Sequence, residues 1–279
     1  MLKRPYSNVS SGAQSARLTF EEARRLIHDA YVRMADEFFQ ETFGYSCTDG
    51  FQSGAAGENI RSFVYGETLV DGVTDLASGL AQSKDETVLF TLIEFFHDHV
   101  SKGIDGHYHS YNDCGWHYST FDKPAGQREW RKQVGGILAH YGEGFVFTET
   151  GDIQTSAPSG LRDIAHAKVP STSTADDNEK VEAAVQRFRR ARATRKEHVD
   201  AIRDLADVLE RLRPKVKEHL LTEDERLLFK LANNFGIRHH NDVQKKGYDS
   251  AWLAWMFYVY LSTIHLVLRL IERDAKTNA

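Results

Sequence analysis

A segment near the C-terminal end carries most of the information on the fold and reads Leu227-Leu228-Phe229-Lys230-Leu231-Ala232-Asn233-Asn234-Phe235-Gly236-Ile237-Arg238-His239-His240-Asn241-Asp242. Its first half has the apolar spacing of an amphipathic helix, and Gly236 predicts where that helix ends. A second apolar segment, Ala251 to Leu268, contains no Asp, Glu, Lys or Arg and predicts another helix. The polar residues between the two helices are dense in hydrogen-bonding groups, so we expect a functional site there.

Residues 179–279 around this stretch predict an up-and-down bundle of four helices. One helix covers Val181 to Ala191, and the next is stopped by Pro214. Thr222 opens the third, and Asp249 or Ser250 caps the last. The last helix is slightly shorter than the roughly 20 apolar residues of a membrane span, so we expect a buried bundle helix and no membrane.

The N-terminal region predicts a separate helical domain over residues 18–166, after a mobile tail at 1–17. A capping box at Thr19 to Glu22 opens a long amphipathic helix, and a second box is expected at Ser83 to Glu86. Alternating residues from Phe145 to Thr155 predict a β-hairpin, which we expect to be the only β structure. With a linker at 167–178, the fold class is mostly α with two domains.

Composition limits the function classes. The chain has 279 residues, 41% hydrophobic and 27% charged, which is typical of a globular protein. Its net charge is −5, whereas a general nucleic-acid binder has an excess of basic residues. Any contact with nucleic acid must therefore be local. It has two cysteines, Cys47 and Cys114, and no apolar segment of a secretory signal follows its first residues, so a reducing cytoplasmic setting is expected.

The polar cluster has the residue types that a metal-independent cleavage of RNA would need. Arg238 can hold a phosphate through two hydrogen bonds, and His239 or His240 can take the proton of a 2′-hydroxyl. Asn241 can orient either histidine. The alternative is a cap network, in which Arg238 and Asn241 bind orphan helix carbonyls and the histidines pack.

Residues Val181 to Ile271 resemble a HEPN-type helical domain. The resemblance is carried by Leu228 to Asn241 and continues into Trp252-Leu253-Ala254-Trp255-Met256-Phe257-Tyr258. The N-terminal half is similar to the accessory domain of AbiJ-like abortive-infection proteins, through Leu89-Phe90-Thr91-Leu92-Ile93-Glu94-Phe95 and through Gly144-Phe145 to Gly151-Asp152-Ile153. The resemblance implies an antiphage toxin or effector that cleaves RNA as a homodimer.

The signature implied by this resemblance is an Arg, a polar residue and a His a few positions later. Arg238 and His239 fit it, whereas Val243, Gln244 and Lys245 occupy the positions where the second His is expected. His240 would have to replace that residue from closer in the sequence. A HEPN-like regulatory module that binds RNA or a nucleotide without cleaving it is therefore the alternative function.

A second group of residues has metal-ligating chemistry. Imidazoles and a thiol, the ligands that zinc prefers, are concentrated in one loop region: His97, His99, His107, His109, Cys114 and His117. Their spacing matches no zinc-finger pattern, and interleaved aspartates could pair with the histidines instead. The alternatives are thus a zinc site and a polar surface loop; no other cofactor is expected.

A basic stretch offers a track for RNA phosphates, consisting of Arg187, Arg189, Arg190, Arg192, Arg195 and Lys196. The alternative is a solvated helix face whose cations pair with Glu182, Glu197 and Asp200.

Overall fold

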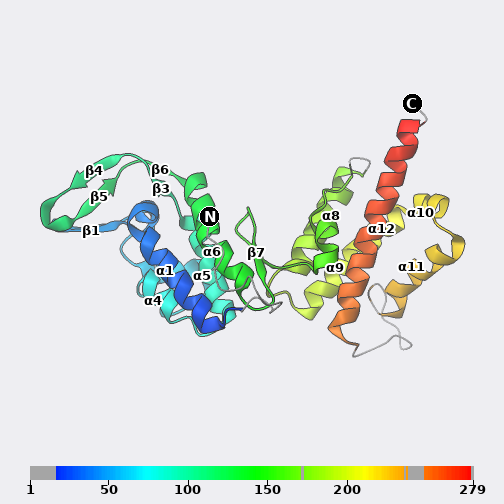
Figure 1. Cartoon of the computed structure of the whole chain (residues 1–279), viewed down its shortest axis with the longest axis horizontal. Helices are drawn as coiled ribbons and strands as arrows, with labels where there is room; N and C mark the ends of the chain where they lie inside the picture. Colours follow the sequence, from blue (N-terminus) through cyan, green and yellow to red (C-terminus); the bar gives the residue numbers. More distant parts are fainter. Residues whose placement is uncertain (1–16, 171–172, 236, 238–247, 278–279) are drawn as a thin grey trace, which may run out of the picture. The chain divides into compact units, whose positions relative to one another are not determined.

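The computed structural model describes residues 17–170, 173–235, 237 and 248–277, and these residues are mostly helical (Figure 1). The chain divides into two compact units, Met1–Thr155 and Ser156–Ala279. The boundary between the two units lies earlier in the chain than the segment 167–178, where the sequence predicts a linker. Ala157 and Ala165, which lie before that segment, are buried in the core of the second unit.

Apart from the helix at Gln40–Phe43, the described helices of the first unit begin at side-chain caps. The helices of this unit are α1 (Phe20–Phe38), α2 (Gln40–Phe43), α3 (Ile60–Thr68), α4 (Leu76–Ala81), α5 (Glu86–His99) and α6 (Lys123–His140). The capping box at Thr19 and Glu22 is confirmed. At α5 the expected box is wrong: Asp85 is the cap and accepts from the Val88 amide, while the Ser83 hydroxyl donates to the Gly79 carbonyl.

Among the residues that the structure describes, four antiparallel strand pairs accompany these helices. They are β1 (Tyr45–Cys47) with β2 (Gly50–Gln52), β3 (Lys102–Gly103) with β6 (Phe121–Asp122), β4 (Gly106–His109) with β5 (Gly115–Tyr118), and β7 (Phe145–Phe147) with β8 (Ile153–Thr155). The β7–β8 hairpin was predicted, but the expectation of no other β structure is wrong. The other strands are short, and β1, β2 and β4 have no buried face, so they lack the alternation that reveals a strand.

Aromatic side chains fill the core of the first unit between α1, α5 and α6. The rings of Phe39, Phe96 and Trp130 meet edge to face, with centroids 5.6 to 6.0 Å apart. The Trp130 indole donates to the Ile93 carbonyl over 3.0 Å, so this buried polar group is satisfied. This core is the rigid base from which the hairpins extend (Figure 1).

The second unit is built from helices that pack around α9. It contains α7 (Arg162–His166), α8 (Ala175–Arg189), α9 (Arg195–Arg211), α10 (Arg213–His219), α11 (Thr222–Asn234) and α12 (Ser250–Thr277). Both α8 and α12 lie against α9, and the ring of Phe188 stacks on that of Phe257 at 3.9 Å (Figure 1). Pro214 lies in the first turn of α10, which starts where α9 ends.

Helix α12 is long and apolar enough to cross a membrane by length and composition alone. However, 56% of its most apolar window is buried inside the second unit. Buried core helices of globular proteins have the same composition.

One buried histidine on α12 predicts a dependence of stability on pH. The His265 side chain is 2% exposed, and neither ring nitrogen has a hydrogen-bond partner among the described residues. Burial, with Arg269 nearby, lowers its pKa. Because the folded pKa lies below the unfolded value of about 6.5, the folded state resists protonation. The contribution of the neutral His265 to the free energy of unfolding should therefore be fully present above about pH 6.5 and should be lost as the pH decreases.

We expect His265→Leu to flatten this pH dependence and to stabilise the protein at acid pH by about 1–3 kcal/mol, the usual cost of a buried unpaired polar group. Thermal unfolding between pH 5 and 8 measures the effect, with the exposed His140→Gln as control. A steep pH dependence that His265→Leu leaves unchanged would contradict the assignment.

Candidate metal centre

Four side chains with metal-ligating atoms converge in the first unit. They are Cys47, His109, Cys114 and His117, and their ligand atoms all lie within 4.8 Å of one another. The Cys47 sulfur is 3.4 Å from Nδ1 of His109, and the Cys114 sulfur is 3.1 Å from Nε2 of His117. Around a tetrahedral zinc ion, with bonds of about 2.0 to 2.3 Å, ligand atoms are about 3.3 to 3.8 Å apart. The cluster is therefore near the size of a zinc coordination sphere.

The first ligand comes from the β1–β2 hairpin. Cys47 is the last residue of β1, and the amide of Asp49 in the following turn points at its sulfur over 3.4 Å. Gly50 completes the turn with φ 122°, a conformation that favours glycine. An amide directed at a cysteine sulfur stabilises the thiolate that a metal requires.

The other three ligands come from the β4–β5 hairpin. His109 ends β4 opposite Gly115, and His117 lies two residues further along β5. The connection is a 3₁₀ turn in which Asn112 adopts φ 52° and Gly115 adopts φ 95°. These left-handed residues reverse the chain tightly, so Cys114 lies between the two histidines in sequence and beside them in space.

The environment of His117 favours the neutral imidazole that binds metals. Its side chain is buried and stacks on the Tyr45 ring at 4.2 Å. Burial lowers its pKa, and the neighbouring His107 and His109 lower it further. Burial and the nearby Cys47 raise the pKa of the Cys114 thiol. Without a cation, the Cys114 thiol therefore resists ionisation; a bound metal ion would reverse this preference.

A buried glutamine connects this hairpin to the helical core. The amide nitrogen of Gln40 donates to the carbonyls of Asp36 and Trp116, each over 2.7 Å. Its amide oxygen accepts from the Tyr118 amide over 3.1 Å. Gln40 thus binds the backbone on both sides of His117, which fixes the position of this ligand.

We expect Gln40→Ala to weaken zinc binding about tenfold, the usual effect of losing an orienting outer-shell group. It should also destabilise the first unit by about 1–3 kcal/mol, because the buried backbone groups lose their partner. Competition with a metal indicator and thermal unfolding measure the two effects, with the exposed Gln52→Ala on β2 as control. If Gln40→Ala behaved like the control, the anchoring role would be wrong.

The predicted metal ligands separate into two groups in the structure. His109, Cys114 and His117 come together, whereas His97, His99 and His107 are outside the cluster. The His107 ring lies 5.0 Å from that of His117 but is not among the four, and His99 Nε2 faces Glu67 at 2.7 Å. The sequence analysis did not include Cys47, because it is remote from the other ligands in sequence. It could have been considered because it is the second of the two cysteines of the chain.

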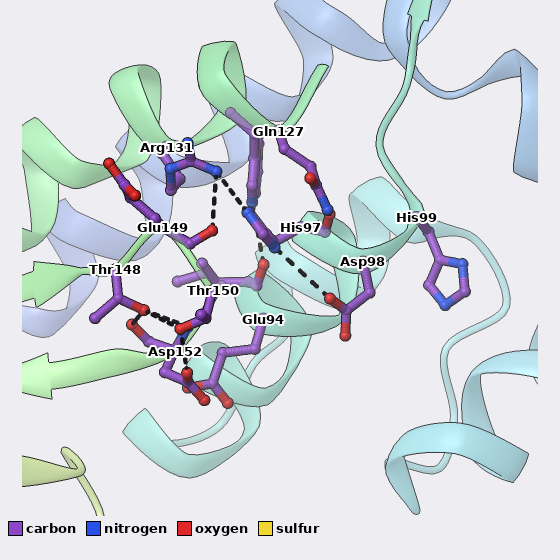
Figure 2. A network of polar contacts seen from close by, with 12 residues as sticks. Glu94, His97, Asp98, His99, Gln127, Arg131, Thr148, Glu149, Thr150 and Asp152 are labelled. Carbon is purple, nitrogen blue, oxygen red and sulfur yellow. Dashed lines mark hydrogen bonds and ion pairs between the residues drawn. The ribbon is translucent and has the colours of Figure 1, made fainter. Parts of the chain in front are cut away.

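His97 belongs instead to a polar network between α5, α6 and the β7–β8 hairpin (Figure 2). Arg131 donates to Nε2 of His97 over 2.9 Å and to the Glu149 carbonyl over 3.3 Å. Gly151, at φ 92°, lies so close that a Cβ there would be 2.3 Å from Nδ1 of His97. Burial and Arg131 lower the pKa of His97. Arg131 thus connects His97 of α5 to the β7–β8 hairpin.

The expected catalytic residues Arg238, His239, His240 and Asn241 lie outside the described residues. The structure describes both flanks of their segment. Arg203 donates to the Ile237 carbonyl over 2.7 Å, and the Tyr248 hydroxyl donates to the Phe235 carbonyl over 3.2 Å. Arg195 donates to the Tyr248 carbonyl over 3.0 Å. The described residues on the two sides of Arg238, Ile237 and Tyr248, thus both contact side chains of α9.

The predicted phosphate track is less continuous than its sequence suggests. Arg189 is buried and donates to the Ala165 carbonyl over 3.5 Å, an environment that does not suit a contact with RNA. Arg187 forms an ion pair with Asp204, which neutralises it. Arg190 and Lys196 are exposed, and Arg192 is half-buried. Arg190 is 4.0 Å from Glu197, as in the solvated-face alternative.

Comparisons of the chain with protein-family models, with curated proteins and with solved structures find no match.

Proposed function

We propose that Cys47, His109, Cys114 and His117 bind one Zn²⁺ ion and that the first unit is a zinc-stabilised module. The observation that carries the proposal is the convergence of four ligand atoms within 4.8 Å from two separate hairpins. Two thiolates and two imidazoles in a compact cluster form a ligand set that favours zinc over magnesium or calcium.

The role we propose for the ion is structural. Four protein ligands fill a tetrahedral shell and leave no position for a substrate or a reactive water. The β1–β2 and β4–β5 hairpins are short, and isolated hairpins of this size are marginal in water. An ion that joins them would fix both relative to the helical core.

Elemental analysis of protein purified without chelator tests the proposal. We expect about one zinc per chain, and we expect Cys114→Ser to lose it. His107→Gln is a matched control, because His107 lies beside the cluster but is not among the four. Protein without zinc, or equal loss of zinc in both variants, would contradict the proposal.

For the second unit we propose an RNA-cleaving effector of the abortive-infection type, in which α8, α9, α11 and α12 form a HEPN-like four-helix bundle that works as a homodimer. The proposal is supported by the contacts that hold the described residues on either side of Arg238, namely Ile237 and Tyr248, against α9. Binding and catalytic residues are often held by such a scaffold of packed helices. In this proposal Arg238 holds the phosphate and His240, with His239 and Asn241, moves the proton.

The alternative for this unit is a regulatory module that binds RNA or a nucleotide without cleaving it. The segment lacks a histidine at positions 243–245, where the family resemblance implies one. Turnover distinguishes the two functions, because the alternative predicts binding with no product.

A further inference from the structure

A cleft of about 760 Å³ lies beside the candidate metal centre. Its walls come from α1, from the β1–β2 hairpin, from β5 and from the start of α4. Cys114 and His117 belong both to the metal cluster and to the lining of the cleft. An ion that joins the two hairpins would therefore also fix the shape of the cleft.

Exposed aromatic rings form one wall of this cleft. Trp116 and Tyr118 project from the same face of β5, with ring centroids 5.9 Å apart and planes 14° from parallel. Trp116 is 49% exposed, and Phe51 on β2 is 48% exposed. The hydrogen bonds of Gln40 hold the backbone at Trp116 and Tyr118. Rigid, accessible aromatic faces of this kind bind flat groups and cations.

Carboxylates make up another part of the lining. Asp36, Glu37 and Asp75 line the cleft, and none of its lining residues is Lys or Arg among those that the structure describes. Glu37 is 3.5 Å from Lys102, so it is partly neutralised, whereas Asp36 and Asp75 are exposed. Burial, with these two carboxylates nearby, raises the pKa of the Tyr31 hydroxyl between them. The negative charge disfavours phosphates and nucleic acids and favours a cation.

We propose that this cleft binds an arginine side chain of a basic peptide, with the guanidinium stacked on Trp116 and paired with Asp36. A planar guanidinium suits both surfaces, because it stacks on aromatic rings and donates two parallel hydrogen bonds to a carboxylate. An ammonium group has neither the plane nor the paired donors. The proposal rests on the proposed zinc site, which would hold β5 in position.

Fluorescence anisotropy of the zinc-loaded full-length protein tests this inference. The probe is a labelled peptide of alternating glycine and arginine, and matched peptides carry lysine or glutamate in place of arginine. We expect the arginine peptide to bind most tightly. Asp36→Asn and Trp116→Ala should each weaken its binding at least about tenfold. The control is Asp29→Asn, an exposed α1 carboxylate that does not line the cleft.

Equal binding of the glutamate or lysine peptide would overturn the proposal. Tight binding of the arginine peptide by both Asp36→Asn and Trp116→Ala would also overturn it. So would single-stranded RNA that displaces the peptide from the parent protein but not from Trp116→Ala. Zinc content is measured in every sample. A parent with one zinc per chain that does not bind the peptide overturns the cleft proposal alone, whereas a parent without zinc overturns the metal proposal.

Discussion

Replacing Cys47 with serine should remove zinc from the protein and destabilise the first unit by at least about 3 kcal/mol. Structural zinc sites contribute apparent binding free energies of about 10–16 kcal/mol in small domains, and loss of one ligand of four forfeits part of that energy. In a unit of this size, 3 kcal/mol corresponds to a decrease in melting temperature of about 6–12 °C. Calorimetry with and without added zinc measures the change.

The control for this prediction is Ser53→Ala, an exposed residue that follows β2. It should keep both zinc and melting temperature. Treating the parent with chelator should reproduce the melting temperature of Cys47→Ser, because both lack the ion. Chelated parent should also react with a thiol reagent at Cys47 and Cys114, which zinc would protect. A parent whose melting temperature is indifferent to chelator would contradict the prediction.

Replacing Arg238 with alanine should slow RNA cleavage by about 10²–10³-fold, the usual effect of removing one group that stabilises developing negative charge. The assay uses full-length protein and single-stranded RNA. Chelator should not reduce cleavage beyond any effect on folding, because the proposed chemistry uses no metal. Arg226→Ala is the matched control, since Arg226 is an exposed residue of α11 that forms an ion pair with Glu223.

Undiminished cleavage by Arg238→Ala would contradict the catalytic assignment. RNA binding by the parent without any product would instead favour the regulatory module. Thermal unfolding of the variant separates a loss of chemistry from a loss of structure.

Features set by local sequence were the ones that could be predicted. The capping box at Thr19 depends on residues three positions apart, and the β7–β8 hairpin connects adjacent strands, so both are visible in a short window. The pairing of β3 with β6 could not be predicted, because each strand has two residues and their partners are distant in sequence. Gly103 packs so closely against the Tyr118 ring that a Cβ would come within 2.3 Å, a contact that no sequence window contains.

The candidate metal centre shows the same limit. His109, Cys114 and His117 belong to one hairpin, so their concentration in sequence pointed to a site. The nearby His97 and His99 were also expected to be metal ligands, but they lie on α5, where His97 contacts Arg131 and His99 contacts Glu67. Cys47 is brought to the cluster by the β1–β2 hairpin, and this tertiary contact has no local signature.

X-ray absorption at the zinc edge, on protein purified without chelator, tests whether the four side chains hold an ion. We expect a four-coordinate ion with two sulfur ligands at about 2.3 Å and two nitrogen ligands at about 2.0–2.1 Å. Any zinc that Cys47→Ser retains should have one sulfur ligand instead of two. Protein with no bound metal, or with zinc coordinated by nitrogen and oxygen alone, would contradict this expectation.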